Sequence, residues 1–260
     1  MGRPSARAEA DGSLTIWLAV GGHVVRVHAT QTESGLAATM EDEAALVSTE
    51  AWEAGAVGDP SVAGLVMAYT GGDGAGIGLA TSADGFSFTS APSPALVPVE
   101  PWEAGHVASP SLVVEPDLGR RLLFYVGGHG AGVGVASSID GGATFTRLAS
   151  GPVLAPSPAA KPAPFDVKPF TSASVVRRAT PLERTVYELW YSVDGVLATA
   201  SSFDGLTFSR FPLNPVLVDS GFDLAGPFRM DGVLLHVRNV SKGTAKKGRG
   251  LGVALFGSPD

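Results

Sequence analysis

The sequence contains no cysteine among its 260 residues. This absence excludes a disulfide framework, a thiolate metal site and a cysteine nucleophile, and it leaves the compartment open because large secreted β domains can lack disulfides. Charged residues are also scarce, at 17%, and the formal net charge is -7. An acidic chain with no clustered basic face is a poor match for nucleic acid, so we expect no nucleic-acid partner.

Long apolar runs and helical periodicity are lacking as well. No apolar run approaches the roughly 20 residues that span a bilayer, so we expect no membrane-spanning segment. The start of the chain, Met1 to Arg3, lacks the apolar core of a signal peptide. It predicts either a cytoplasmic protein or a secreted or periplasmic protein whose leader was removed. The nearest approach to a 3.6-residue period, Glu41 to Glu53, is interrupted at Ser48 and Thr49 and is predicted to be a connecting loop.

Glycine and proline are abundant, with 34 and 19 residues, and 45% of the chain is hydrophobic. This composition is typical of many short strands separated by turns. Stretches such as Leu65 to Tyr69 and Leu122 to Val126 have no polar face, which is typical of strands buried on both sides by neighbouring sheets. A chain of this length can bury a substantial core as one all-β domain.

The segment Trp52 to Thr89 contains an arm with an acid, a buried strand, a Gly-rich turn, a second strand and an Asp-Gly turn into a third strand. The same parts recur from Trp102, 50 residues later, and this period is typical of one propeller blade. We therefore predict an all-β fold, a five-bladed β-propeller forming a single domain over residues 1–260. The five repeats are expected at about 3–45, 58–91, 108–150, 171–211 and 225–258.

An aromatic-acid pair precedes each of the last four repeats. The pairs are Trp52-Glu53, Trp102-Glu103, Phe165-Asp166 and Phe222-Asp223. The aromatic residue lies nine positions before an equivalent serine in the second, third and fourth repeats, which predicts that it fills an equivalent crevice between blades. An acid that recurs once per blade favours a structural clamp over a catalytic role. The fifth repeat breaks the spacing, and either its blade has one strand fewer or residues from elsewhere complete it.

The repeated motifs carry a family resemblance. A Pro-Val-Leu exit, a Trp-acid pair, x-Pro-Ser-Val, a strand ending in Tyr, Gly-Gly and Ile-Gly-x-Ala-Thr-Ser-x-Asp-Gly-x-x-Phe-Thr follow one another in fixed order. Together they resemble the five-bladed propeller superfamily of glycoside hydrolase families 43, 32, 62, 117 and 130, over nearly the whole chain from Arg3 to Ser258. The resemblance implies a sugar ligand at an axial pocket, although one fold hosts many functions.

A second resemblance rests on Ser138 to Phe145, which is similar to the Asp-box turn of sialidases. In those propellers the Asp and Ser side chains of the box bond backbone amides, far from the active site. The corresponding turns Ser82 to Phe88 and Ser202 to Phe208 are one residue shorter, and the arginines show no pattern that would gather three around a carboxylate. The sialidase resemblance is therefore the less favoured one.

Glycoside hydrolysis requires at least two carboxyl groups, one to protonate the leaving oxygen and one to attack or activate water. The residues expected to face the axis are Arg3, Asp59, Ser109, Ser172 and Gly226. Only Asp59 matches the Asp-Pro element of the resembled enzymes. Where those enzymes often carry Glu-Gly-Pro in a late blade, this chain has Ala-Gly-Pro. The resemblance thus implies an incomplete hydrolytic set.

We therefore predict a carbohydrate-binding or carbohydrate-processing propeller, a monomer whose ligand is a glycan or small sugar. Asp59, His106 and Arg3 are the expected polar groups of its pocket, and Trp52 and Trp102 are candidate walls for sugar stacking. The remaining expected sugar-binding residues are Glu103, Ser109 and Ser172.

Two other hypotheses stay open. One is an active glycoside hydrolase with Asp59 as base and Asp166 or Glu103 as acid, and the other is a non-catalytic protein-interaction scaffold. His129 replaces Asp73 in the Gly-rich turn and is expected on a blade edge. No histidine or carboxylate cluster has metal-ligand spacing, so no cofactor or metal is predicted. Some of the resembled enzymes hold an axial calcium ion, for which the sequence assigns no ligands.

Overall fold

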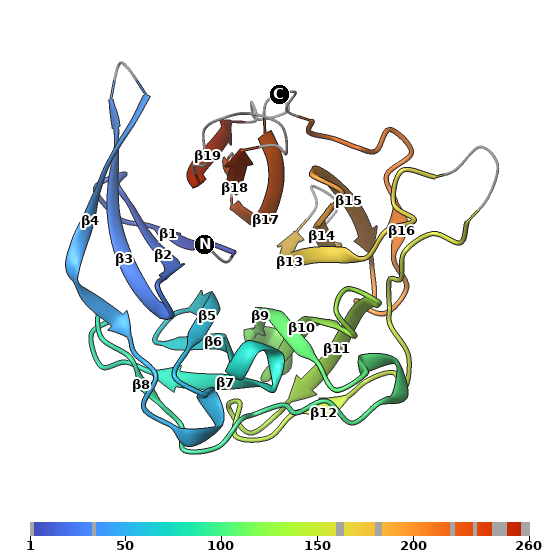
Figure 1. Cartoon of the computed structure of the whole chain (residues 1–260), viewed down its shortest axis with the longest axis horizontal. Helices are drawn as coiled ribbons and strands as arrows, with labels where there is room; N and C mark the ends of the chain where they lie inside the picture. The colour runs from blue at the N-terminus through green and yellow to red at the C-terminus, as the bar shows by residue number, and fades with distance from the viewer. Residues whose placement is uncertain are drawn as a thin grey trace.

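The computed structural model describes residues 3–32, 35–159, 164–179, 184–218, 222–230, 233–240 and 249–255. Its sheets are arranged around a common centre, each with its earliest strand innermost (Figure 1). Within these ranges the regular structure consists of strands and short 3-10 helices. No helix in the described part of the chain is both long and apolar enough to cross a membrane.

Each sheet is an antiparallel meander. The first contains β1 (Ser5–Ala8), β2 (Leu14–Val20), β3 (His23–Thr32) and β4 (Gly35–Leu46). The second contains β5 (Val57–Ala63), β6 (Val66–Gly71), β7 (Gly76–Thr81) and β8 (Thr89–Ser90). The third contains β9 (Val107–Glu115), β10 (Arg120–Gly127), β11 (Gly132–Ser138) and β12 (Thr146–Arg147).

The remaining sheets follow the same order. The fourth contains β13 (Phe170–Ala179), β14 (Thr185–Val193), β15 (Val196–Ser202) and β16 (Ser209–Arg210). The last contains β17 (Phe222–Met230), β18 (Val233–Val240) and β19 (Arg249–Leu255). The 3-10 helices are η1 (Ala51–Glu53), η2 (Gly72–Gly74), η3 (Pro101–Glu103) and η4 (Pro116–Leu118).

The prediction of an all-β propeller is confirmed, but the prediction of five equivalent blades is not. Four sheets have four strands, and the repeat expected at 225–258 contributes a sheet of three. The ring thus shows four complete blades, and residues 256–260 lie outside the described residues. Each innermost strand contacts the next one along the chain, and β17 also contacts β1.

The prediction of a loop over Glu41 to Glu53 is wrong at both ends. Strand β4 continues through Leu46 because its backbone pairs with β3, with Met40 opposite Val27 and Ala44 opposite Val25. Residues 51–53 form η1, whose N-cap Glu50 and third residue Glu53 form a reciprocal capping box. Pairing with a neighbouring strand thus overrode the weak local pattern.

The middle strands are buried on both faces, as their sequences predict. Met67, Ala68 and Tyr69 in β6 are fully buried, and so are Leu123 and Phe124 in β10. Apolar side chains of β6 and β7 form one cluster with those of β9 and β10. Burying each large apolar side chain contributes about 2 kcal/mol, so the interface between blades is a main source of stability.

A serine in each of the first three innermost strands joins its blade to the next one. The hydroxyl oxygen accepts a hydrogen bond from a backbone amide of the following innermost strand. The amides of Val62, Leu112 and Val175 donate to the hydroxyls of Ser5, Ser61 and Ser111, at 2.9, 2.9 and 2.8 Å. These bonds cross between sheets, where no backbone ladder can form.

Replacing Ser61 by Ala should lower the free energy of unfolding by about 1–3 kcal/mol, because the amide of Leu112 then loses its partner in a buried site. Chemical denaturation measures the change. As a matched control, Ser87→Ala removes an exposed hydroxyl and should change stability by less than about 0.5 kcal/mol. Equal effects of the two substitutions would contradict a bridging role for Ser61.

Candidate functional site

A backbone bulge shapes the start of the innermost strands in the second and third blades. Asp59 and Ser109 have left-handed φ angles of 46° and 51°, and each precedes a proline. The strand register shifts at both places. A bulge tolerates a proline because the residue is released from the ladder, and it re-aims neighbouring side chains. The two residues therefore occupy equivalent positions near the centre of the ring.

Asp59 is half-buried and holds two blades together. Its Oδ1 accepts the backbone N–H of Arg3 at 2.9 Å, and its Oδ2 accepts the hydroxyl of Thr70 at 3.2 Å. The Thr70 hydroxyl oxygen in turn accepts the backbone N–H of Ser109 at 3.0 Å. One carboxylate thus has a structural role in a polar chain that crosses three blades, while part of it stays open to solvent.

Arg3 packs against the innermost strands β5 and β9, and Figure 1 shows the N-terminal end of the chain near the centre of the ring. Its side chain is 1% exposed, and Nη2 donates to the carbonyl oxygens of Pro60 and Pro110. Burial lowers the pKa of Arg3 to about 10, against the opposing effect of the Asp59 charge. The predicted ligand contact of Arg3 is thus not open to solvent.

The same contacts test whether these residues could hold an axial calcium ion. The carbonyls of Pro60 and Pro110 are the kind of oxygen that calcium prefers, but here they face the cationic guanidinium of Arg3. Among the described residues, no group of three or more His, Cys, Asp or Glu is placed to hold a metal ion. The described centre of the ring therefore does not fit such an ion.

His106 lies at the start of the third blade, packed against two Gly-rich turns. Its ring is 4.1 Å from the ring of His129, centroid to centroid, with 33° between the planes. A Cβ at Gly74 would lie 2.2 Å from Cδ2 of His106, so only glycine allows the imidazole to pack there. His129 and Asp73 are exposed at equivalent turn positions and have φ angles of 54° and 52°.

Three neighbouring residues, His129, Asp73 and Asp59, act on the pKa of His106. Burial and then the neighbouring His129 lower the pKa of His106, and the charges of Asp73 and Asp59 oppose the shift. The imidazole is therefore neutral over more of the pH range, and a neutral imidazole can donate from one nitrogen and accept at the other. We call Asp59, Asp73, His106 and His129 the mouth cluster.

The acids of the aromatic-acid pairs lie inside their own blades. Glu103 is fully buried and accepts hydrogen bonds from the Tyr125 hydroxyl at 2.7 Å and from Arg147 Nε at 2.8 Å. Two backbone amides of the preceding loop also donate to it. Burial raises the pKa of Glu103, but the bonds from Arg147 and Tyr125 outweigh this and hold the pKa below its usual value.

Asp166 has the same surroundings in the fourth blade. It is 1% exposed and accepts from Arg210 Nε at 2.6 Å and from the Tyr191 hydroxyl at 3.2 Å. Burial raises the pKa of Asp166, but the surrounding bonds and the charge of Arg210 lower it overall. A general acid needs a raised pKa. Asp166 is thus bonded to Tyr191 and Arg210, whereas Asp59 is bonded to Arg3 and Thr70.

Two tryptophans predicted as sugar-stacking walls pack against tyrosines of their own blades. Trp52 stacks on Tyr69 at 5.9 Å and Trp102 on Tyr125 at 6.0 Å. Each indole also covers a glycine at the end of the middle strand; a Cβ at Gly71 would lie 2.4 Å from the Trp52 ring. Both indoles are half-buried, and their stacked faces belong to the blade interior.

Two predicted sugar-binding serines are buried between blades. The hydroxyl of Ser109 accepts from the backbone N–H of Ala173 at 3.3 Å, and that of Ser172 accepts from the N–H of Gly226 at 2.8 Å. Of the predicted site residues, Asp59 and His106 are both partly exposed, and the charge of Asp59 acts on the pKa of His106. Asp73 and His129 were not predicted; the His-for-Asp exchange at one turn position was the available signal.

Comparison with known proteins gives structural relatives only. No family model and no curated protein matches the sequence. A thermostable family-43 glycoside hydrolase is similar over 100% of this chain and 90% of its own, at 14% identity and a TM-score of 0.65. The likeness establishes the propeller fold.

Further relatives have the same fold. An endo-1,4-β-xylanase from Bacteroides thetaiotaomicron is similar over 99% of this chain and 94% of its own, at 16% identity and a TM-score of 0.65. A fructofuranosidase from Schwanniomyces occidentalis, complexed with fructosylnystose, is similar at 12% identity and a TM-score of 0.61. The match covers 98% of this chain and 56% of that enzyme.

Replacing Arg147 by Ser should lower the free energy of unfolding by about 3 kcal/mol, because it leaves the buried Glu103 carboxylate without its cation. Thermal or chemical denaturation measures the change. The control is Lys168→Ser, which breaks an ion pair with Asp194 that is more than half exposed on both sides and should cost less than about 1 kcal/mol. A loss of unfolding free energy no larger than that of the control would contradict a stabilising role for the Arg147–Glu103 ion pair.

Acid should destabilise the protein through His106. Because burial holds the folded-state pKa below the usual 6.5, the unfolded chain takes up the proton first as pH falls. Stability is therefore lost as pH falls through 6.5 toward the folded-state pKa. Thermal unfolding of His106→Asn from about pH 8 to 5 should show a shallower loss than the wild type. The exposed His28→Asn should keep the wild-type slope; identical slopes for all three proteins would refute the assignment.

Proposed function

We propose that this chain binds a glycan or small sugar at the mouth cluster of a glycoside-hydrolase-like propeller. The observation that carries the proposal is the contact of the partly exposed His106 with the exposed His129, at 4.1 Å between ring centroids, within the field of the Asp59 and Asp73 charges. Carboxylates accept hydrogen bonds and a neutral imidazole both donates and accepts, so the cluster offers what sugar hydroxyls need. The structural relatives, whose names include a xylanase and a fructofuranosidase, favour a sugar over other small polar ligands.

The three-stranded sheet β17–β19 serves as the fifth blade in this proposal. Its innermost strand contacts both β13 and β1, which is what a ring of five requires. The backbone N–H of Gly226 in β17 donates to Ser172, in line with the polar bridges between the other blades. The mouth would then be lined from all sides by innermost strands.

Binding without hydrolysis is the favoured form of the proposal. The acids Glu53, Glu103 and Asp166 are buried in clamps and have lowered pKa values, which is opposite to the need of a general acid. A hydrolase remains the second function to test, because Asp73 supplies another carboxylate that acts on His106 together with Asp59. Retaining and inverting mechanisms both depend on two such groups flanking the scissile bond.

The test is a glycan array followed by titration calorimetry with the sugars that bind. Asp59→Asn, which keeps the shape of the side chain, and His106→Ala should each weaken binding about tenfold or more, because each removes a hydrogen-bonding group of the site. Asp117→Asn is the control, since Asp117 is exposed at the opposite end of the third blade and pairs with Arg177. It should bind as the wild type does.

The same sugars, incubated with the wild type, separate the alternatives. Intact ligand supports binding alone. Release of sugar that is abolished in Asp59→Asn would replace the binding proposal with the hydrolase. No saturable binding of any glycan at millimolar concentration would overturn both and leave a scaffold function.

A further inference from the structure

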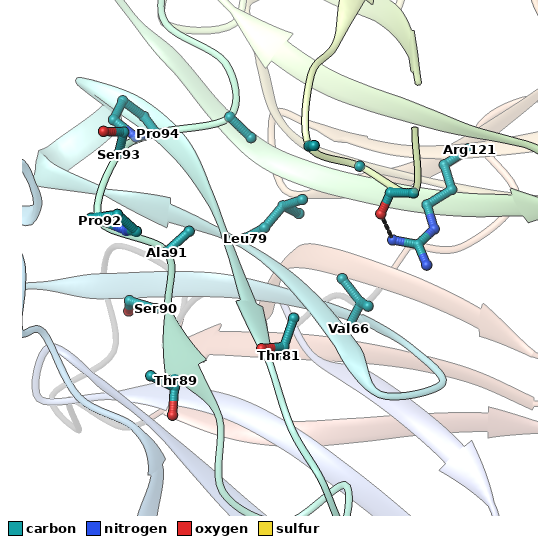
Figure 2. A pocket seen from close by; sticks show the side chains of 14 residues that line it. Val66, Leu79, Thr81, Thr89, Ser90, Ala91, Pro92, Ser93, Pro94 and Arg121 are labelled. Atoms are coloured by element: carbon teal, nitrogen blue, oxygen red, sulfur yellow. Dashed lines mark hydrogen bonds between the residues drawn. The ribbon is translucent and has the colours of Figure 1, made fainter. Parts of the chain in front are cut away.

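A crevice is lined by residues of the second and third blades and of the linker that joins them (Figure 2). Its volume is about 440 Å³, within the range of small-molecule sites in proteins. None of the residues that line it belongs to the mouth cluster, and one of them, Ser90, also donates a hydrogen bond to Glu53 in the clamp of the second blade. The crevice is therefore a separate feature, and its inference goes beyond the proposed function.

One wall of the crevice is apolar. Val66 of β6 and Leu79 of β7 come from the second blade, and Pro92 and Pro94 come from the linker that follows it. Figure 2 shows Val66 and Leu79 between Arg121 and the Pro92-to-Pro94 segment. Prolines keep this wall rigid, so little conformational entropy of the wall is lost when an apolar ligand packs against it. Hydroxyl groups, including that of Ser93, complete the lining.

The charged residue of the lining is Arg121, and no acidic side chain lines the crevice with it. Its Nη1 donates to the backbone carbonyl of Gly141, which fixes the guanidinium in place. Among the described residues no carboxylate lies within ion-pair distance of Arg121. Other arginines of the third and fourth blades are paired instead: Arg120 with Glu115, Arg147 with Glu103 and Arg210 with Asp166.

The acidic residue of this turn, Asp140, already accepts hydrogen bonds from within the turn. Asp140 precedes Gly141, but its carboxylate accepts hydrogen bonds from the hydroxyls of Ser138 and Thr144 at 2.7 and 2.6 Å and from the amide of Thr144 at 3.0 Å. Those bonds lower the pKa of Asp140, so its charge is committed to holding the turn. The guanidinium of Arg121 thus faces the crevice with donors that no carboxylate of this turn takes up.

A glycine in the same turn makes room for the guanidinium. Gly142 has φ 98°, and a Cβ there would lie 3.0 Å from Cδ1 of Leu79 and 3.1 Å from Nη1 of Arg121. The turn is one residue longer than the matching turns of the second and fourth blades. The longer turn therefore brings its backbone beside the cation and the apolar wall, and the site is formed before any ligand arrives.

We propose that this crevice binds a small amphipathic carboxylate, with its anionic end on Arg121 and its apolar body against Val66, Leu79 and the two prolines. Arginine is the side chain best suited to such an end, because its planar fork matches the two carboxylate oxygens. The apolar body supplies affinity in proportion to the area that it buries. A neutral ligand of the same shape loses the charged contact with Arg121 and keeps the burial of its apolar body.

The experiment titrates octanoate into the full-length protein by calorimetry, with 1-octanol as the neutral counterpart. We expect saturable octanoate binding that is about tenfold or more tighter than binding of 1-octanol. Arg121→Gln should reduce octanoate binding to the level of 1-octanol and leave 1-octanol unchanged. Ser93→Trp, which fills the crevice with a large ring, should weaken both ligands, and circular dichroism verifies that each variant is folded.

Equal binding of octanoate and 1-octanol to the wild type, or octanoate binding unchanged in Arg121→Gln, would overturn the proposal, as would the absence of octanoate binding at millimolar concentration. Sugar binding is measured on the same samples. Arg121→Gln should bind sugar as the wild type does, and Asp59→Asn should bind octanoate as the wild type does. Failure at one site is thereby distinguished from failure at the other.

Discussion

Neighbouring blades of this protein share no backbone ladder, and this constraint determines most of its structure. Within a sheet, each strand is held by backbone hydrogen bonds, but the innermost strands of successive blades belong to different sheets. Apolar packing supplies the area of contact, and side chains, together with single backbone bonds such as that from the Val57 amide to the Gly22 carbonyl, supply the specific bonds. The hydroxyls of Ser5, Ser61 and Ser111 each accept a hydrogen bond from a backbone amide of the next blade. These bonds explain why polar residues occur on strands that are otherwise apolar.

The same constraint determines which acids are free for function. Glu53, Glu103 and Asp166 bind a tyrosine hydroxyl of a middle strand, so each anchors the incoming arm to its blade. Carboxylates used in this way cannot also face a ligand. In the mouth cluster, Asp73 and His129 lie on exposed turns and His106 packs beside them, whereas Asp59 also bonds Arg3 and Thr70.

Much of the fold could be predicted from the sequence, and the reason is the repeat. Strands such as Leu122 to Val126 show no polar face because packed sheets cover both sides, and that signal led directly to a propeller. A clamp role for the acids also followed from recurrence. Their partners could not be predicted, because Glu53 meets Ser90 across 37 residues that no local rule connects. The extension of β4 through Leu46 depended on pairing with β3, which is likewise a tertiary effect.

The second blade departs from its neighbours at one point of its clamp. Ser90 stands on β8 where the third and fourth blades carry Arg147 and Arg210, so Glu53 is held by the hydroxyls of Tyr69 and Ser90 and by two backbone amides. A buried carboxylate that loses its cation is costly, whereas one held only by neutral donors has no such cation to lose. The third and fourth arms of the ring therefore each depend on one arginine, and the second arm depends on none.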